Sequence, residues 1–466
     1  MYDKIRKLHF VGIGGIGMSG IAEVLLNLNY QVSGSDMAEN ASVRRLKELG
    51  ATIRIGHAPE HVRDVDVVVR SSAITLENPE IAEARRLRIP VARRAEILAE
   101  LMRMKYGIAI AGTHGKTTTT SMVATLLEVA DMDPTVVNGG VVKAFGSNAR
   151  LGTGDFLVTE ADESDGTFLK LFPTIAVVTN MDPEHMEFYK SFDAVRQAYL
   201  AFLEKIPFYG LAVLCNDHPQ VAELVHRLED KRIITYGLEP GADLQARDIR
   251  REGGKTRFEV VCNDPEAGGE LRFLGVAAIP IPGRHNVLNA LSAIAVAREL
   301  EIPWETIVAG LARYRGVRRR FDILMESEQR VIIDDYAHHP TEIRATLSAA
   351  RDAYGSRRLV AIFQPHRYSR VNDLFDEFLG CFPQADLVLV DRIYPAGEQP
   401  IPGPLEQGGQ WPLVRGIREK SGVEALSLPG GENWREALEG LLKPGDVALF
   451  LGAGSISHRA RDFAAT

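Results

Sequence analysis

The chain has 466 residues, of which 25% are charged, and a formal net charge of -8. This length suits about three domains of ordinary size, and the acidic balance argues against a nucleic-acid partner, because phosphate binding requires clustered basic charge. No apolar run reaches the ~18 residues of a membrane span, and the three cysteines lack metal or redox spacing, so we expect a cytoplasmic protein with no membrane partner.

A glycine-rich loop follows the first apolar strand, residues 8–11. Residues 12–17 match G-x-G-x-x-G and open a helix that runs to Leu28, and the second strand ends at Asp36, 24 positions after Gly12. This arrangement binds a pyrophosphate at the helix start and a ribose at the acidic residue. The pattern fits NAD and a nucleotide-sugar diphosphate equally well. The predicted ligand contacts are Gly14, Gly15, Ile16, Gly17 and Asp36.

A further strand, residues 65–69, ends near two hydroxyl residues, Ser71 and Ser72. Ligands bind at the carboxyl edge of parallel sheets, so both serines are candidate substrate contacts, although helix capping or turn formation explains them equally well. The helical stretch 94–105 completes the first domain.

A second glycine-rich loop, Gly-Thr-His-Gly-Lys-Thr-Thr at residues 112–118, lies between an apolar strand and a segment of helical spacing. Glycines let backbone N–H groups approach phosphate oxygens, the Lys116 ammonium adds positive charge, and the Thr117 hydroxyl suits Mg²⁺. The usual motif has a glycine six residues before the lysine, where this chain has Ile110, so the loop is a shortened form. The predicted phosphate contacts are Gly112, Thr113, His114, Gly115, Lys116, Thr117 and Thr118.

Two polar loops follow apolar strands of the same domain. Strand 156–159 leads into Glu160, and strand 175–178 leads into a loop that contains His185. Mg²⁺ ligands lie at such strand ends in nucleotide-binding α/β domains. We therefore favour Glu160 as a metal or substrate ligand, whereas His185 fits a ligand and a solvated loop residue equally well. The short strands and polar turns of residues 210–274 predict a peripheral sheet that has no catalytic or binding role.

Two asparagines and an arginine cluster precede the last domain. Asn286 and Asn289 are three positions apart at the start of an Ala-rich helix and share one face, where they are either caps or partners for the edge of a purine. Residues 313–320 hold five arginines. Most fit solvated linker charges, and at least one can reach a phosphate from a domain boundary.

The segment from Phe321 onward again alternates strands and helices. Its strands lead into polar loops at residues 334–340, 364–370 and 391–398. Arg367 and Arg370, three residues apart beside a histidine-rich loop, suit a carboxylate or phosphate ligand.

Five segments, at residues 9–20, 71–74, 112–118, 334–340 and 363–370, together resemble the Mur ligases of bacterial cell-wall synthesis. The resemblance implies an α/β protein with three-domain Mur ligase architecture. It implies an N-terminal Rossmann-like domain over residues 1–105, a central P-loop ATPase domain over 106–319 and a C-terminal Rossmann-like domain over 320–466. The implied activity is ATP-dependent joining of UDP-N-acetylmuramate to L-alanine through an acyl phosphate, with Mg²⁺, by a monomer or homodimer.

The resemblance also implies roles by position. The first glycine loop, with Ser71 and Ser72, would bind the UDP-sugar rather than NAD. For ATP, the implied contacts outside the phosphate loop are Asn286 and Asn289 at adenine, Asp335 at the ribose and Arg320 at the phosphates. The implied residues around the incoming alanine are Tyr336, His338, Arg367 and Arg370.

For the metals, the resemblance implies that Thr117 and Glu160 bind one Mg²⁺, and that Glu160 and His185 bind a second. Several related ligases have a carbamylated lysine near this site, but residues 192–204 contain no lysine, so no carbamate ligand is implied here. The implied catalytic residues are Lys116, Glu160, His185, His338, Arg367 and Arg370.

Three alternatives remain. A related ligase attaches a recycled tripeptide to the same UDP-sugar, but the loop with Arg367 and Arg370 and residues 394–398 are more similar to the alanine-adding member. A nicotinamide oxidoreductase would explain Gly12 and Asp36 but not Lys116. A non-catalytic nucleotide-binding regulator would require vestigial ATP and metal residues.

Overall fold

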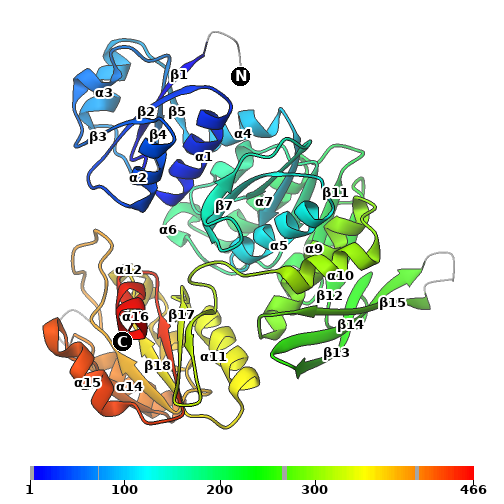
Figure 1. Cartoon of the computed structure of the whole chain (residues 1–466), viewed down its shortest axis with the longest axis vertical. Helices are drawn as coiled ribbons and strands as arrows, with labels where there is room; N and C mark the ends of the chain where they lie inside the picture. Colours follow the sequence, from blue (N-terminus) through cyan, green and yellow to red (C-terminus); the bar gives the residue numbers. More distant parts are fainter. Residues whose placement is uncertain (1–4, 72, 265–269, 405–408, 466) are drawn as a thin grey trace. The chain divides into compact units, whose positions relative to one another are not determined.

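The computed structural model describes residues 5–71, 73–264, 270–404 and 409–465 (Figure 1). Ser72, one of the predicted substrate contacts, lies outside the described residues. The chain divides into two compact units, one of residues 1–249, 257–279 and 287–315, the other of residues 250–256, 280–286 and 316–466. The domain boundaries at 105/106 and 319/320 stay predictions.

The first sheet has five parallel strands in the order β3-β2-β1-β4-β5. Its elements are β1 (Lys7–Val11), α1 (Ile16–Asn27), β2 (Gln31–Asp36), α2 (Ala41–Glu48), β3 (Thr52–Ile55), β4 (Val67–Arg70), α3 (Pro79–Arg86), β5 (Val91–Arg93) and α4 (Arg94–Met102). The alternating β and α elements explain the parallel order, since each crossover helix returns the chain to the same end of the sheet. The predicted helix after the glycine loop is confirmed, because α1 begins at Ile16.

The second sheet has ten strands in the order β15-β14-β13-β12-β11-β10-β6-β9-β7-β8. Its strands are β6 (Tyr106–Ala111), β7 (Thr135–Val142), β8 (Ser147–Arg150), β9 (Phe156–Glu160), β10 (Ile175–Val178), β11 (Leu211–Cys215), β12 (Ile233–Gly237), β13 (Leu244–Glu252), β14 (Lys255–Asp264) and β15 (Glu270–Ile279). Its helices are α5 (Lys116–Val129), α6 (Met186–Tyr189), α7 (Phe192–Leu203), α8 (Pro219–Val225), α9 (Arg284–Glu299) and α10 (Trp304–Arg313).

The centre of this sheet consists of short, apolar, buried strands. β6 pairs in parallel with β10 on one side and with β9 on the other, and β10 pairs in parallel with β11. Ile108, Ala109, Ile110 and Ala111 of β6 are fully buried, as expected for a strand covered on both faces. The loops that follow these four strands therefore emerge at one edge.

One expectation for this region is wrong. The sequence pattern over residues 210–274 predicted a peripheral sheet, but β11 to β15 continue the central sheet, and β11 is the direct neighbour of β10. The reason is that β11 is a fully buried apolar strand. The loop after β11 consequently lies at the same edge as the phosphate loop.

The third sheet has the order β16-β17-β21-β18-β19-β20, in which β16 is antiparallel and the other pairs are parallel. Its strands are β16 (Asp322–Glu326), β17 (Arg330–Asp335), β18 (Leu359–Phe363), β19 (Leu387–Val390), β20 (Glu424–Ser427) and β21 (Asp446–Leu451). Its helices are α11 (Pro340–Tyr354), α12 (Tyr368–Asp373), α13 (Phe375–Leu379), α14 (Trp411–Ser421), α15 (Trp434–Leu441) and α16 (Ile456–Ala464).

The third sheet is buried on both faces. Alternate strand residues belong to two separate apolar clusters: Ile333 and Ala361 lie in one, and Ile332 and Ile362 lie in the other. This two-sided burial is typical of doubly wound sheets and confirms the predicted α/β class. Within the described ranges, no helix combines the length and the apolarity that a membrane crossing requires.

A buried carboxylate with three imidazoles lies behind the first glycine loop. Glu80 is fully buried, and its carboxylate contacts Nδ1 of His61 at 2.5 Å, Nδ1 of His57 at 3.3 Å and Nε2 of His9 at 3.6 Å. Ser35 Oγ donates a 2.5 Å hydrogen bond to the same group. Burial alone would raise the pKa of Glu80, but the hydrogen bonds from His9, Ser35 and His61 outweigh it and lower this pKa to about 2.

We expect the Glu80→Gln substitution to destabilise the protein at pH 7 by about 3 kcal/mol, because it removes the buried charge that three largely enclosed imidazoles face. A carboxyl with a lowered pKa contributes stability above its unfolded pKa and loses that contribution as the pH falls toward its folded pKa. The difference in the free energy of unfolding between wild type and variant should therefore narrow from about pH 4.5 downward. Urea unfolding at several pH values measures it. The control is Glu77→Gln, which changes an exposed residue just before α3. A difference in unfolding free energy that stays constant with pH would contradict a stabilising role of the ionised Glu80.

Candidate active site

The phosphate loop connects β6 to α5 and adopts a conformation that requires glycine at two positions. Gly112 has φ +131° and Gly115 has φ +83°, in the left-handed region. A Cβ atom at Gly115 would lie 2.6 Å from Asn289 Oδ1, and one at Gly112 would collide with Thr179 Oγ1. The loop is therefore a closely packed cradle of backbone groups at the start of a 14-residue helix, which is an arrangement that binds anions.

The Lys116 ammonium lies inside this cradle. Its Nζ donates to Gly112 O at 2.5 Å and to Thr113 O at 3.2 Å, and it forms an ion pair with the Glu163 carboxylate at 2.8 Å. The side chains of Lys116 and Glu163 are 15% and 4% exposed. Burial disfavours the charged lysine, but the charges of Glu163 and Asp162 and the hydrogen bond to Glu163 together outweigh burial and raise the pKa of Lys116. Lys116 therefore stays cationic.

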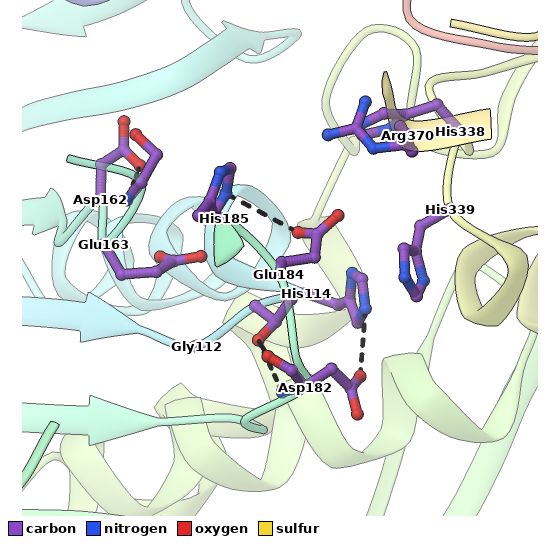
Figure 2. Close-up of polar contacts among 12 residues, drawn as sticks. Gly112, His114, Asp162, Glu163, Asp182, Glu184, His185, His338, His339 and Arg370 are labelled. Carbon is purple, nitrogen blue, oxygen red and sulfur yellow. Dashed lines mark hydrogen bonds and ion pairs between the residues drawn. The ribbon is translucent and has the colours of Figure 1, made fainter. Parts of the chain in front are cut away.

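Three residues form a group with the geometry of a metal site. One ligand atom from each of Glu163, Glu184 and His185 lies within 4.8 Å of the others (Figure 2). Two carboxylates and an imidazole are suitable ligands for a divalent cation. The sequence interpretation missed Glu163 and Glu184, although both belong to acidic loops that it identified. Their proximity depends on the strand order, in which β9 and β10 lie on either side of β6.

The other two predicted metal ligands lie in the same unit but not in this group. Glu160 Oε1 accepts a 2.7 Å hydrogen bond from Gly139 N. Thr117 is buried at the start of α5, and its carbonyl accepts a 3.3 Å bond from Asn138 Nδ2. Their roles as Mg²⁺ ligands therefore stay predictions.

The two predicted adenine contacts are both on α9 and both buried. Asn289 Oδ1 accepts a 3.2 Å hydrogen bond from Thr119 Oγ1, in the first turns of α5, so Asn289 lies beside the phosphate loop. Asn286 Nδ2 donates to Pro282 O at 2.7 Å.

The first glycine loop is supported by the end of β2. Gly12 N and Ile13 N donate to Ser35 O at 2.9 and 3.0 Å, and Gly14 N donates to Asp36 Oδ2 at 2.7 Å. Asp36, which the sequence pattern assigned to a ribose, thus holds the loop in shape with one of its oxygens. A Cβ at Gly14 would lie 2.9 Å from that same oxygen, so a side chain there would displace the Asp36 carboxylate from the loop.

A cavity of about 210 Å³ lies in the same unit, and its lining is rich in arginine. It is lined by Arg70, Ser71, Arg93, Arg94, Ala95, Asp165, Thr167 and Phe188. The predicted contact Ser71 is part of this lining, and Arg94 packs against Gly17 of the glycine loop. The sequence interpretation assigned no role to the three arginines, because each lies at the end of a strand or the start of a helix without a recognisable motif. Guanidinium groups in a cavity suit phosphate or carboxylate ligands.

The third sheet presents its own polar cluster at the ends of β17 and β18. The Tyr336 ring lies 4.5 Å from the Arg319 guanidinium and 5.2 Å from that of Arg320. His338 Nδ1 lies 3.0 Å from Tyr336 O and 3.0 Å from Glu342 Oε2. Because a carbonyl can only accept, Nδ1 of His338 carries hydrogen and its Nε2 is the atom available to accept a proton.

Two aromatic residues in this cluster had no role in the sequence interpretation. His366 stacks on Tyr394 at 5.5 Å, and Arg370 Nη1 lies 3.4 Å from His366 Nδ1. Burial, followed by the charges of His338, Arg370 and Arg367, lowers the pKa of His366 to about 3, so this imidazole is neutral.

The remaining predicted residues of this unit are held by backbone hydrogen bonds. Arg367 has φ +67° at the start of α12, and its N–H donates to Tyr394 O at 2.9 Å. Asp335 accepts backbone hydrogen bonds from Phe321 N at 2.7 Å and from Ala337 N at 2.8 Å. Burial raises the pKa of Asp335 to about 6 despite the nearby Arg320.

Three protein-family models match the chain in series. They are described as the Mur ligase family catalytic domain, over residues 7–106, the Mur ligase middle domain, over 110–297, and the Mur ligase glutamate ligase domain, over 319–454. Among curated relatives, UDP-N-acetylmuramate–L-alanine ligase of Magnetococcus marinus is 61% identical over 465 residues, which are 100% of this chain and 98% of the relative. The enzyme of the same name from Azorhizobium caulinodans is 53% identical and covers 98% of this chain and 97% of its own length.

Solved structures agree with these matches. UDP-N-acetylmuramate–alanine ligase of Thermotoga maritima has a TM-score of 0.82 at 30% identity and covers 98% of both chains. A murein peptide ligase of Psychrobacter arcticus has a TM-score of 0.71 at 25% identity, again with 98% of both chains covered. On this evidence the chain belongs to the Mur ligase family.

Proposed function

We propose that this protein is an ATP-dependent ligase that joins L-alanine to UDP-N-acetylmuramate and releases UDP-N-acetylmuramoyl-L-alanine, ADP and phosphate. The observation that carries the proposal is the pairing of the Lys116 phosphate cradle with the group Glu163, Glu184 and His185 at one sheet edge. The names of the relatives at 61% and 53% identity supply the substrates.

The chemistry explains why a ligase needs such an edge. A carboxylate does not react with an amine at neutral pH, because oxide is too poor a leaving group. ATP supplies the phosphoryl group that turns the carboxylate into an acyl phosphate, from which phosphate can leave. Catalysis of phosphoryl transfer consists mainly of positioning and charge neutralisation. The protein therefore needs a fixed cation and a metal site, rather than a nucleophile.

The phosphate cradle fits ATP on its own geometry. Two glycines without room for a Cβ expose the backbone N–H groups at the start of α5, and Lys116 is held cationic among them. In our proposal Lys116 neutralises the terminal phosphates, and Asn286 and Asn289 contact the adenine. From the resemblance, Arg320 and Asp335 are proposed as contacts to the phosphates and the ribose.

The proposed Mg²⁺ ligands come from the acidic loops after β9 and β10. Glu163, Glu184 and His185 offer a suitable donor set, and Thr117 and Glu160 are proposed from their motif positions. Glu163 is shared, because it also pairs with Lys116. A metal cation and Lys116 therefore compete for one carboxylate. This competition couples metal binding to the ion pair between Lys116 and Glu163.

The proposed sugar-nucleotide site combines the first glycine loop with the arginine-lined cavity. Gly14, Gly15, Ile16 and Gly17 bring backbone groups to the start of α1, and the cavity beside Ser71 adds guanidinium groups. This arrangement suits a pyrophosphate and a lactyl carboxylate better than a nicotinamide cofactor. It supports a UDP-sugar over the oxidoreductase alternative.

For the amino acid, we propose that Arg367 and Arg370 bind the carboxylate of alanine and that Tyr336 and His338 lie around its amine. The Nε2 atom of His338 is available to accept a proton, and the neutral His366 accepts from Arg370 and so orients it. The tripeptide-adding alternative has weaker support, since the murein peptide ligase neighbour is only 25% identical.

The test is phosphate release from ATP, Mg²⁺ and UDP-N-acetylmuramate, with L-alanine or the tripeptide added in separate reactions. We expect release with L-alanine and a product heavier by one alanyl residue. Release only with the tripeptide would transfer the protein to the recycling activity. Phosphate release with neither substrate would favour the alternative of a non-catalytic nucleotide-binding regulator.

We expect the Lys116→Ala substitution to reduce kcat by at least ~10²-fold, because it removes the fixed cation from the phosphate cradle. Binding of UDP-N-acetylmuramate, measured by calorimetry, should stay within about twofold of wild type, since the sugar-nucleotide site lies elsewhere. The matched control is Lys255→Ala, an exposed lysine in the same sheet. Loss of sugar-nucleotide binding in Lys116→Ala would count against two separate sites.

We expect the His185→Ala substitution to raise the Mg²⁺ concentration for half-maximal activity by ~10-fold or more, because it removes one ligand of the candidate metal group. Mn²⁺ binding followed by electron paramagnetic resonance gives a readout that does not depend on turnover. Unchanged metal titrations would remove His185 from the site.

A further inference from the structure

Three neighbouring strands of the second sheet deliver two histidines and an aspartate to the phosphate loop. His114 follows the end of β6 by three residues, Asp182 follows the end of β10 by four, and His218 follows the end of β11 by three. β10 lies between the other two strands, parallel to both and in register with them. The three side chains therefore meet at one edge, although they are 104 residues apart along the chain from first to last.

The loop after β10 holds the phosphate loop in place through hydrogen bonds to His114 and Thr113. His114 N donates to Asn180 Oδ1 at 2.7 Å, and His114 O accepts from Thr179 Oγ1 at 2.6 Å. Asp182 N donates to Thr113 Oγ1 at 2.8 Å. The shortened loop, with Ile110 in place of the usual first glycine, is thus shaped by this external support as well as by its own two glycines.

The side chains of His114, Asp182 and His218 add further contacts. One oxygen of Asp182 lies 3.2 Å from His114 Nε2, and the other lies 3.4 Å from His218 Nε2, so the carboxylate bridges two imidazoles (Figure 2 shows the first of these contacts). The three side chains are only 14%, 26% and 21% exposed, in the order His114, Asp182, His218.

A carboxylate beside a phosphate cradle needs an explanation, because it would repel the polyphosphate of ATP. Here each oxygen faces an imidazole N–H, so little of the negative charge is left exposed toward the loop. The same contacts fix the ring of His114, the central residue of the cradle. His218 acts one step further away, since its contact is with Asp182 and not with the loop.

We infer that Asp182 and His218 are positioning residues for the nucleotide: Asp182 holds His114 and the phosphate loop in their binding conformation, and His218 holds Asp182. The inference rests on the proposed ATP site and adds to it two residues that no motif assigned. It gives the region after β11 a function, in place of the chemically idle sheet expected from the sequence.

The experiment measures binding of ADP in the presence of Mg²⁺ to the full chain by calorimetry, together with thermal unfolding of each variant. We expect His218→Ala to weaken ADP binding ~3–10-fold through the loss of one supporting hydrogen bond, and Asp182→Ala to weaken it more. The double variant should bind like Asp182→Ala alone, because His218 acts through Asp182. His218→Gln, which keeps an N–H donor, should recover most of the affinity.

His226→Ala is the matched control, since it changes an exposed histidine at the end of α8, the helix that His218 precedes. Unchanged ADP affinity in His218→Ala would overturn the inference, and so would a lower unfolding temperature without a change in affinity, which indicates a purely structural role. Additive effects in the double variant would also overturn it. If Asp182→Ala does not fold, the His218→Ala and His218→Gln pair decides the question. Absence of ADP binding by the wild type would instead refute the proposed function.

Discussion

The parallel, in-register pairing of β6 with its neighbours is the constraint on which the proposed site depends. β9, β6, β10 and β11 lie side by side and are buried on both faces, so their polar loops can emerge only at the strand ends. The loops after β6, β9 and β10 bring Lys116, Glu163 and His185 together. Ligand binding at the carboxyl edge of such sheets is a general property of α/β folds.

Both glycine loops depend on side chains from an adjacent strand. In the first, Asp36 at the end of β2 accepts a hydrogen bond from Gly14 N. In the second, Asn180 after β10 accepts one from His114 N. A glycine-rich segment is flexible in isolation, and these acceptors fix its conformation at the point where a phosphate would approach. Each glycine motif therefore identifies the loop but not the acceptor side chain that fixes its conformation.

The electrostatics of the second sheet edge combine a buried cation with several carboxylates. Lys116 forms an ion pair with Glu163, and the Asp182 carboxylate contacts two imidazoles, so both carboxylates have partners at this edge. The unit that contains the third sheet follows a similar principle, since Arg319 and Arg320 lie against the ring of Tyr336. Desolvated cations held in place before a ligand arrives are what phosphoryl transfer requires.

The sequence by itself determined the α/β class, both glycine loops and the family, because glycine positions, buried apolar strands and contiguous motifs are local features of the chain. It could not determine that β11 joins the central sheet, that Glu163 pairs with Lys116, or that His218 reaches Asp182. These contacts join residues 36 or more positions apart, and strand order decides them. Strand order depends on how whole elements pack, and so only the tertiary structure specified the supports of the phosphate loop.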